Sequence, residues 1–504
     1  MKQLESHQRV NALTEDVAAQ PREIATRSFS MSDQLEFAEF SGDFNPMHIS
    51  PLAARRTQMG APVVHGMHQV LWGLENAGAF VPDGIHIVGV QVRFPQPLYL
   101  DERADLLLIA RDESFLRLAI RANKIVTGKI VLKLGRAAWP SPARLSGEFE
   151  SFGEPATCHE LAFEEITGIA GDLPAYLRWA DAERIFPKAC KLIGTIRVNS
   201  IAALSRLVGM VCPGLHSIFS SIDVQLGRVE ENRLRFSVLS TDARFSVVRQ
   251  SVSGGGIEGE VTAFMRMPPR KQPGIAEFRR LVRHDEFAGS VALVIGASRG
   301  VGEVVAKTIG AGGGHVLATY CTGVEECEQV ASEIWAAGGR CDVMQYDAQR
   351  SPAEQLAILP VVPSSVYYFA TPRIFGRTEG LLEKARFYEF LETYVNRFYA
   401  LCSYLRESGI ESLTIFYPSS IAVDSRPESM TAYAMAKAAG EILCDSMTVH
   451  WPGFRVIARR LPRMATDQTA TLVSVDSMPI MDTMLPIISE VEHSILRATT
   501  VSNA

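Results

Sequence analysis

The stretch EFAEFSGDFNPMHIS, residues 36–50, brings a carboxylate, an amide and an imidazole close together at Asp43, Asn45 and His48. The Gly, Asp, Asn and Pro residues of the stretch each favour tight backbone conformations, so a turn accounts for part of the pattern. A turn alone does not account for the pairing of an acid with an imidazole, which general acid–base catalysis needs. We therefore interpret the stretch as a candidate catalytic turn. The competing interpretation is an ordinary turn that carries a surface histidine.

The composition is that of an ordinary soluble globular protein. Of 504 residues, 47% are hydrophobic and 21% charged, with a formal net charge of −6, which disfavours both disorder and nucleic-acid binding. No apolar run is long enough to span a bilayer, and residues 1–30 lack the apolar core of a signal peptide. Eight cysteines without a CxxC pair indicate reduced thiols rather than disulfides or a zinc site. We expect a cytoplasmic protein that binds no metal, membrane or nucleic acid.

Two polar segments rich in Pro and Gly, around 138–160 and 267–289, divide the chain into three parts. The first two parts read as a diverged repeat, in which Gly42 aligns with Gly171 and Gly128 with Gly259, about 130 residues apart. Each copy has an apolar helical stretch, at 63–78 and 198–211, followed by alternating strand-like residues. A long helix followed by antiparallel strands predicts an α+β layer in which a sheet wraps around one helix.

The second copy lacks the polar residues of the first. Asp43 has a counterpart in Asp172, but proline and leucine take the positions of Asn45 and His48. We therefore expect the first copy to carry the chemistry and the second to be structural.

The string FSGDFNPMHI, followed by VVHGM at 63–67, resembles the MaoC-like (R)-specific enoyl-thioester hydratase/dehydratase family. The resemblance covers residues up to about 140 and implies a hotdog fold, and through the repeat a double hotdog to about residue 268. It implies that Asp43 and His48 face one water molecule and that Asn45 orients this water or its partners. The backbone N–H of Gly66 would stabilise the thioester oxygen as negative charge develops there. Ser50 departs from the family, many members of which have an acid at this position.

His65 and His68 leave two interpretations open. Either histidine could belong to the site, and either could simply pack at the start of the helix.

The stretch VALVIGASRGVGEVVAKTIGAGGGHVLATY, residues 291–320, reads as a strand, a glycine loop, a helix and a second strand. In such a unit a pyrophosphate rests on the amides of the helix. The pattern resembles the short-chain dehydrogenase/reductase family, on the strength of Gly296, Gly300 and Gly302 in the loop and Ser420, Tyr433 and Lys437 downstream. The resemblance implies cofactor contacts at Gly296, Ser298, Arg299, Gly300, Gly302, Asp347 and Ala370.

The downstream residues suit the reduction of a ketone. Hydride arriving at a carbonyl carbon leaves an alkoxide, which the Tyr433 phenol would protonate, with its pKa lowered by the Lys437 ammonium. Ser420 would polarise and position the carbonyl. Asn396 matches the proton-relay asparagine of the family, although the stretch from it to the serine is slightly short.

The strand after the glycine loop ends in HVLATYCTG, residues 315–323, without an acid to hold a ribose 2′-hydroxyl. Arg299 inside the loop could pair a 2′-phosphate, so NADPH is favoured over NADH. Two departures concern this pocket: residues 368–371 read Tyr-Phe-Ala-Thr where the family has Asn-Asn-Ala-Gly, and residues 462–463 read Pro-Arg where it has Pro-Gly.

The two resemblances describe consecutive steps on one substrate. We expect a catalytic hotdog at 1–145, a degenerate second hotdog at 155–268 and a Rossmann-type doubly wound parallel sheet at 286–504. The hypothesis is a bifunctional 3-oxoacyl-thioester reductase and 3-hydroxyacyl-thioester dehydratase in fatty-acid- or polyketide-like acyl processing. In the alternatives the hotdog half only binds acyl chains or mediates dimerisation beside a lone ketoreductase. The acyl carrier, coenzyme A or an acyl carrier protein, stays open, and a homodimer is expected.

Overall fold

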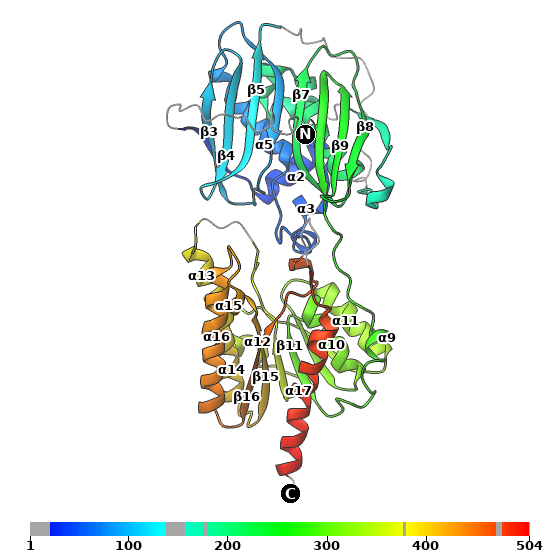
Figure 1. Cartoon of the computed structure of the whole chain (residues 1–504), viewed down its shortest axis with the longest axis vertical. Helices are drawn as coiled ribbons and strands as arrows, with labels where there is room; N and C mark the ends of the chain where they lie inside the picture. Colours follow the sequence, from blue (N-terminus) through cyan, green and yellow to red (C-terminus); the bar gives the residue numbers. More distant parts are fainter. Residues whose placement is uncertain (1–20, 138–156, 175–178, 376–379, 470–475, 503–504) are drawn as a thin grey trace, which may run out of the picture. The chain divides into compact units, whose positions relative to one another are not determined.

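The computed structural model describes residues 21–137, 157–174, 179–375, 380–469 and 476–502 (Figure 1). The chain forms two compact units, one made of Met1–Ile49 with Pro62–Arg266 and the other of Ser50–Ala61 with Met267–Ala504. Among the helices of the described residues, none has the length and apolar character needed to cross a membrane.

The first unit is built on one antiparallel sheet with the strand order β1-β3-β4-β5-β2-β7-β10-β9-β8-β6. The two repeat copies meet where β2 pairs with β7, from Gly89 opposite Gln225 to Arg93 opposite Ser221. The two copies therefore form one continuous sheet. Its strands are β1 (Arg22–Ser28), β2 (His86–Arg93), β3 (Arg103–Arg111), β4 (Phe115–Ala122), β5 (Ile125–Gly135), β6 (Ala170–Pro174), β7 (Ser217–Leu226), β8 (Arg233–Asp242), β9 (Val247–Gly254) and β10 (Ile257–Met265).

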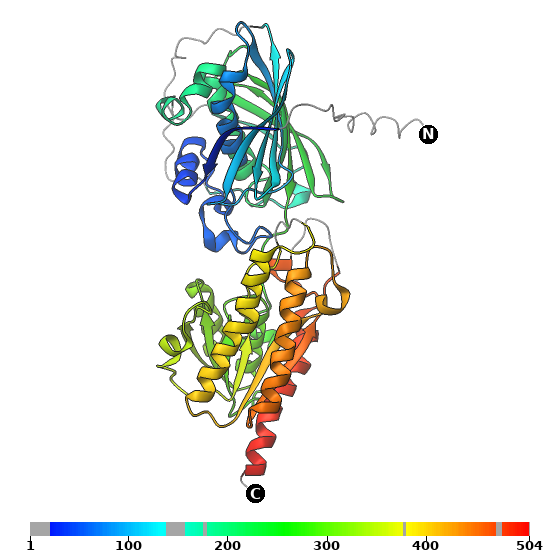
Figure 2. The ribbon, with the colours of Figure 1, turned by 90° about the vertical axis from the view of Figure 1, so that its left-hand side faces the viewer.

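Helices cover one face of this sheet (Figure 2). The two predicted helical stretches form α5 (Gly66–Ala77) and α8 (Thr195–Arg206), and most of their side chains are buried. Leu71 and Leu204 belong to one core shared by both copies, so the predicted α+β hotdog architecture is confirmed. The remaining helices of the unit are α2 (Met31–Ser41), α3 (Pro46–Ile49), η1 (Gly78–Phe80), η2 (Phe163–Glu165), α6 (Trp179–Ile185), α7 (Pro187–Ile193) and the π-helical turn η3 (Leu207–Val211).

The second unit has a parallel sheet with the strand order β13-β12-β11-β14-β15-β16, which is the Rossmann-type order. Alternate residues of a strand face opposite sides of a sheet. Accordingly Val294 of β11 joins the core under α10, α11 and α17, whereas Leu293 joins the core under α14 and α16. The predicted doubly wound sheet is confirmed. The strands are β11 (Val291–Ile295), β12 (His315–Tyr320), β13 (Arg340–Gln345), β14 (Ser365–Tyr368), β15 (Leu413–Ser420) and β16 (Phe454–Leu461).

The helices of the second unit include a short one from the N-terminal third of the sequence, α4 (Pro51–Ala54). Ser50 caps this helix, because its Oγ accepts from the Ala53 amide at 3.3 Å. The residue that departs from the MaoC-like pattern thus begins a new element. The other helices are α9 (Ile275–Phe278), α10 (Gly300–Ala311), α11 (Val324–Ala336), α12 (Pro352–Leu356), α13 (Lys384–Leu391), η4 (Glu392–Arg397), α14 (Phe398–Glu407), α15 (Ala422–Ser425), α16 (Thr431–His450), η5 (Asp467–Thr469) and α17 (Ile480–Ser502).

Candidate functional site

The turn at 42–48 is built by its own polar side chains. Gly42 ends α2 in the left-handed conformation, with φ 75°, which glycine adopts without strain. The Asn45 amide then donates to Asp43 Oδ1 at 3.1 Å, and the Met47 amide donates to Asn45 Oδ1 at 3.1 Å. These bonds turn the chain into α3, which carries His48. The His48 Nδ1 lies 2.7 Å from the Val63 carbonyl, so Nδ1 carries the proton and Nε2 is the nitrogen available for chemistry.

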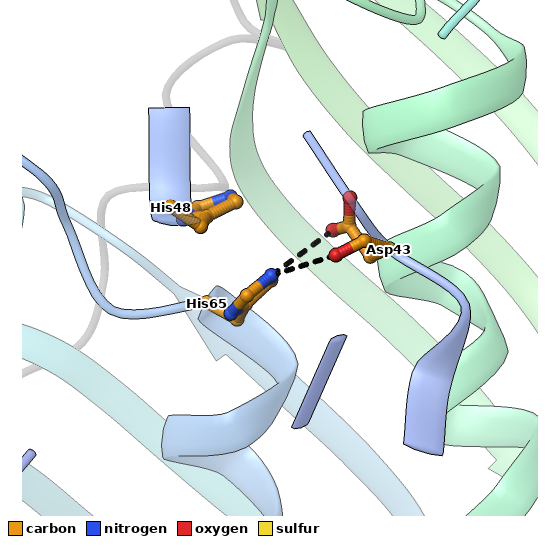
Figure 3. Close-up of side chains that lie close together, drawn as sticks. All are labelled: Asp43, His48 and His65. Carbon is orange, nitrogen blue, oxygen red and sulfur yellow. Dashed lines mark hydrogen bonds and ion pairs between the residues drawn. The ribbon is translucent and has the colours of Figure 1, made fainter. Parts of the chain in front are cut away.

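Asp43, His48 and His65 form one buried cluster (Figure 3). The two imidazole rings stack with centroids 3.9 Å apart and planes inclined by 27°. His65 Nε2 lies 3.1 Å from the Asp43 carbonyl oxygen and 3.9 Å from Asp43 Oδ2. Its Nδ1 lies 2.8 Å from Gln34 Oε1, so each ring nitrogen faces an oxygen acceptor and the neutral ring donates to one of the two. The structure therefore brings His65 into the site.

His68, the other histidine whose role the sequence left open, lies in the core. Its ring stacks on Phe37 with centroids 4.6 Å apart, and its Nδ1 is 3.4 Å from the Gln34 amide nitrogen. Within the part of the chain that the structure describes, His68 contacts neither Asp43 nor His48.

The second repeat copy supplies part of this site, although the sequence indicated only a structural role for it. Ser205 on α8 donates to Asp43 Oδ2 at 2.6 Å, and Asn45 Nδ2 donates to the Gly209 carbonyl at 2.9 Å. A Cβ on Gly209 would lie 2.3 Å from Asp43 Oδ1, so only glycine fits there. An isolated glycine inside a helical pattern often marks such a close approach. Gly209 was therefore the one residue by which the sequence could have indicated that the second copy takes part in the site.

Burial sets the protonation of this cluster. It raises the pKa of Asp43, against the opposing effects of the His48 charge and the Ser205 hydrogen bond. Burial likewise lowers the pKa of His48, against the Asp43 charge, and lowers that of His65 well below its usual range. The neutral forms of the acid and the base are thus both favoured, which suits a pair that exchanges protons with a substrate.

The same three side chains offer a carboxylate oxygen and two imidazole nitrogens within 4.8 Å of one another, a spacing that a metal ion can bridge. Several of these atoms already have protein partners: Asp43 Oδ2 binds Ser205, His48 Nδ1 binds Val63 and His65 Nε2 binds the Asp43 carbonyl. His48 Nε2 is the nitrogen left for an outside molecule. The arrangement of the cluster therefore suits acid–base chemistry better than metal binding.

Gly66, the predicted oxyanion donor, is the first residue of α5. The amides of a first helical turn have no acceptor within their own helix, so they can serve an anionic oxygen. A Cβ on Gly66 would lie 3.0 Å from the Phe94 ring, which is a tight contact.

A cavity of about 820 Å³ marks the second site, at the carboxyl ends of the parallel strands. Its volume suits a ligand of nucleotide size. The glycine loop approaches the strand closely: a Cβ on Gly302 would lie 2.1 Å from the Gly296 carbonyl oxygen. The residues present therefore fit a dinucleotide. The cavity is lined by the predicted Gly296, Ser298, Arg299, Gly300, Gly302, Asp347, Ala370, Ser420, Tyr433 and Lys437.

The three predicted catalytic residues of this cavity come together from two elements. Ser420 ends β15, and Tyr433 lies on α16, where Ser420 opposes the rise in its pKa. Lys437 lies one turn after Tyr433, donates to the Pro418 carbonyl at 2.6 Å and lies 3.7 Å from the centroid of the Tyr394 ring.

The pKa values correct the expectation that Lys437 lowers the pKa of Tyr433. Burial raises the pKa of Tyr433, and the Ser420 hydrogen bond only opposes this rise. Burial also lowers the pKa of Lys437 to about 7, so its own charge is disfavoured in the folded chain. A lysine that is itself partly neutral gives its neighbour little electrostatic help.

The structure does not bring Asn396 to the cavity. Asn396 lies exposed on η4 and donates to Glu392 at 2.6 Å. The π-helical geometry of η4 instead directs Tyr394 toward Lys437, and Tyr394 lines the cavity. The match of Asn396 to the proton-relay asparagine of the family, whose distance to the serine was already short, is therefore not supported by the position of its side chain.

Two family models match the chain. One, described as a MaoC like domain, matches residues 12–114, and one described as short chain dehydrogenase matches residues 290–362. The chain has a MaoC-like dehydratase domain followed by a short-chain dehydrogenase domain. The candidate residues of the MaoC-like turn lie inside the first match, and the glycine loop of the dehydrogenase domain lies inside the second.

Curated relatives match parts of the chain. A 3-hydroxybutyryl-CoA dehydratase of Methylorubrum extorquens is 32% identical over 88 residues, which are 18% of this chain and 49% of that protein. An uncharacterized oxidoreductase of the same organism is 30% identical over 105 residues, which are 21% of this chain and 38% of that protein. The chain thus spans less than half the length of each.

Among solved structures, an angucycline C-6 ketoreductase, LanV, with bound NADP is 20% identical, with a TM-score of 0.32. That match covers 36% of this chain and 76% of the ketoreductase.

Proposed function

We propose that the chain is a bifunctional enzyme that reduces a 3-oxoacyl thioester and dehydrates the resulting 3-hydroxyacyl thioester to a 2-enoyl thioester, or runs the pair in reverse. The observation that carries the proposal is the presence of two complete acid–base groups in one chain. One is the buried Asp43–His48 pair, and the other is Ser420, Tyr433 and Lys437 on a dinucleotide-sized cavity. Joining two such sites raises the local concentration of the intermediate at the second one.

In the dehydration step, His48 Nε2 accepts the C2 proton of the hydroxyacyl thioester. Asp43, whose raised pKa favours the protonated form, donates a proton to the departing C3 hydroxyl, which leaves as water. The helix amide of Gly66 stabilises the thioester oxygen while the C2 carbanion forms. Transfer of a proton from His48 to Asp43 restores the starting state.

In the reduction step, Ser420 hydrogen-bonds the ketone oxygen and Tyr433 donates a proton to it. A bound nicotinamide cofactor supplies the hydride. We favour NADPH, because the loop that follows β12, residues 321–323, has no carboxylate and Arg299 lines the same cavity.

The test is to incubate the full chain with NADPH and acetoacetyl-coenzyme A and to identify the products by mass spectrometry. We expect NADPH oxidation with both hydroxyacyl and dehydrated products. Tyr433→Phe should abolish oxidation but leave the hydration of crotonyl-coenzyme A intact, and Asp43→Asn should do the opposite. If the wild type makes only the hydroxyacyl product and Asp43→Asn changes nothing, the MaoC-like half is a binding module. Lack of both activities on coenzyme A and carrier-protein thioesters alike would refute the proposal.

We further propose a homodimer in a reducing, cytoplasmic setting. Four large apolar side chains on α14 and α16 are exposed: Tyr399 at 46%, Met435 at 45%, Ile442 at 69% and Val449 at 74%. Apolar side chains concentrated on neighbouring helices favour a protein interface. All eight cysteines lie in the described chain and are unpaired, which fits a reducing compartment.

A further inference from the structure

A segment that the sequence places directly after His48 belongs to the dehydrogenase unit. Ser50–Ala61 is part of that unit, and Arg55 at the end of α4 lines the cavity together with the glycine loop. The segment is held compactly: Ser50 caps α4, and Thr57 Oγ1 donates to the Ala54 carbonyl at 2.8 Å. Arg55 is therefore presented to the cavity by an ordered turn that lies outside the dehydrogenase sequence match.

Arg55 lies at the loop where nicotinamide enzymes read the adenosine ribose. Its Nη1 donates to Thr322 Oγ1 at 2.9 Å, and Thr322 follows β12 by two residues. In a Rossmann-type fold, an acid at the end of this strand binds a ribose 2′-hydroxyl, and an arginine nearby accommodates a 2′-phosphate. The neighbouring Cys321 lines the cavity as Arg55 does.

Three arginines gather beside this loop, and their direct ion pairs are with two carboxylates. Arg55, Arg56 and Arg299 face two carboxylates, Glu326 and Asp467. Arg55 pairs closely with Glu326, Arg56 Nε lies 3.2 Å from Asp467, and Arg299 Nη1 lies 3.4 Å from Asp467. The three guanidinium groups thus share two counter-ions.

Arg55 also has spare capacity for binding an anion. Its Nε is buried and has no hydrogen-bond partner in the described part of the chain. Burial lowers its pKa to about 10, helped by repulsion from Arg299 and Arg56, so the side chain is still charged at neutral pH. A dianionic phosphate would relieve this repulsion.

We propose that Arg55 determines cofactor specificity by binding the 2′-phosphate of NADPH, together with Arg299. Arg299 is itself oriented by this segment, because its Nη1 donates to the Arg55 carbonyl at 3.1 Å. The cofactor preference of the reductase would then depend on a residue from the stretch that follows the MaoC-like motif. The inference rests on the proposed use of NADPH.

The test is calorimetric titration of the full chain with 2′,5′-ADP and with 5′-ADP, which differ only in the 2′-phosphate. Wild type should bind 2′,5′-ADP more tightly. Arg55→Gln should weaken binding of 2′,5′-ADP by roughly tenfold or more and that of 5′-ADP by less than about twofold, as the loss of a charge-assisted hydrogen bond predicts. Arg55→Lys should restore part of the difference. Arg280→Gln, an exposed arginine of the same unit outside the cavity lining, is the matched control and should change neither affinity.

The other outcomes separate the two proposals. If wild type prefers 2′,5′-ADP and only Arg299→Gln removes the preference, the role of Arg55 is refuted while the use of NADPH stands. If Arg55→Gln weakens both ligands equally, Arg55 is a structural residue and the inference is also refuted. If wild type binds both ligands equally, the proposed use of NADPH fails and the role of Arg55 fails with it. Melting curves without ligand verify that each variant is folded.

Discussion

At the scale of single residues, Asp43 shows how a candidate catalytic acid is prepared by its neighbours. Its side chain accepts from the Asn45 amide and from Ser205, while His65 contacts its carbonyl oxygen. The carboxyl group is nearly fully buried, at 1% exposure. The hydrogen bonds to the carboxylate and the His48 charge offset only part of the cost of burying its charge, so the pKa of Asp43 is raised.

Gly209 provides a test of the role of the second repeat copy. Gly209→Ala would place a Cβ 2.3 Å from Asp43 Oδ1, so the acid or the helical turn must move. We expect the hydration of crotonyl-coenzyme A to fall by about 100-fold, since small misplacements of reacting groups are costly. NADPH-dependent reduction should be unchanged. Gly227→Ala, where a Cβ meets nothing within 4 Å, is the control, and equal rates in both variants would contradict the assignment.

The lowered pKa of Lys437 predicts how the stability of the chain depends on pH. Its pKa is lowered from 10.5 to about 7 in the folded chain, so between these values the unfolded chain binds more protons. Stability of the wild type therefore rises through this range relative to a variant without the amine. At pH 6 the melting temperature of Lys437→Met should be higher than that of the wild type. The difference between the two melting temperatures should be smaller at pH 9. Exposed Lys384→Met should show no such trend, and a constant difference at both pH values would contradict the shift.

At the scale of elements, the approach of α10 to β11 decides whether a dinucleotide can bind. The first turn of α10 offers free amides to a pyrophosphate only if the glycine loop keeps its path. Gly302 is the point of closest approach, with a Cβ position 2.1 Å from the Gly296 carbonyl oxygen.

Gly302→Ala should therefore weaken NADPH binding by at least tenfold, measured by the fluorescence of bound NADPH. Crotonyl-coenzyme A hydration reports on the other unit and should persist. Gly274→Ala, whose Cβ would have only one neighbour at 3.8 Å, should bind NADPH normally. An unchanged affinity in Gly302→Ala would show that the loop can rearrange.

At the scale of the whole molecule, the exposed faces of α14 and α16 predict an interface between two copies of the chain. Ile442→Glu with Val449→Glu should turn a dimer into a monomer, because each buried charge would be unpaired in the interface. Size-exclusion chromatography with light scattering measures this mass. Leu281→Glu, at a 52% exposed position just after α9, which packs on α10, should leave the mass unchanged. A monomeric wild type would refute the dimer.

The sequence by itself determined those features that depend on local order along the chain. Asp43, Asn45 and His48 lie in one turn, and Tyr433 and Lys437 lie one helical turn apart, so spacing alone places them together. Strand periodicity and the glycine loop likewise indicated both folds. These features depend on backbone geometry within a few residues.

Only the tertiary structure decided which distant residues complete each site. Ser205 and Gly209 reach Asp43 because β2 pairs with β7 and joins the two copies in one sheet. Arg55 lines the cavity of the second unit because its segment belongs to that unit rather than to the first. A π-helical turn directs Tyr394 rather than Asn396 toward Lys437. Contacts between segments far apart in sequence arise from packing and burial of the whole chain, and local spacing does not contain them.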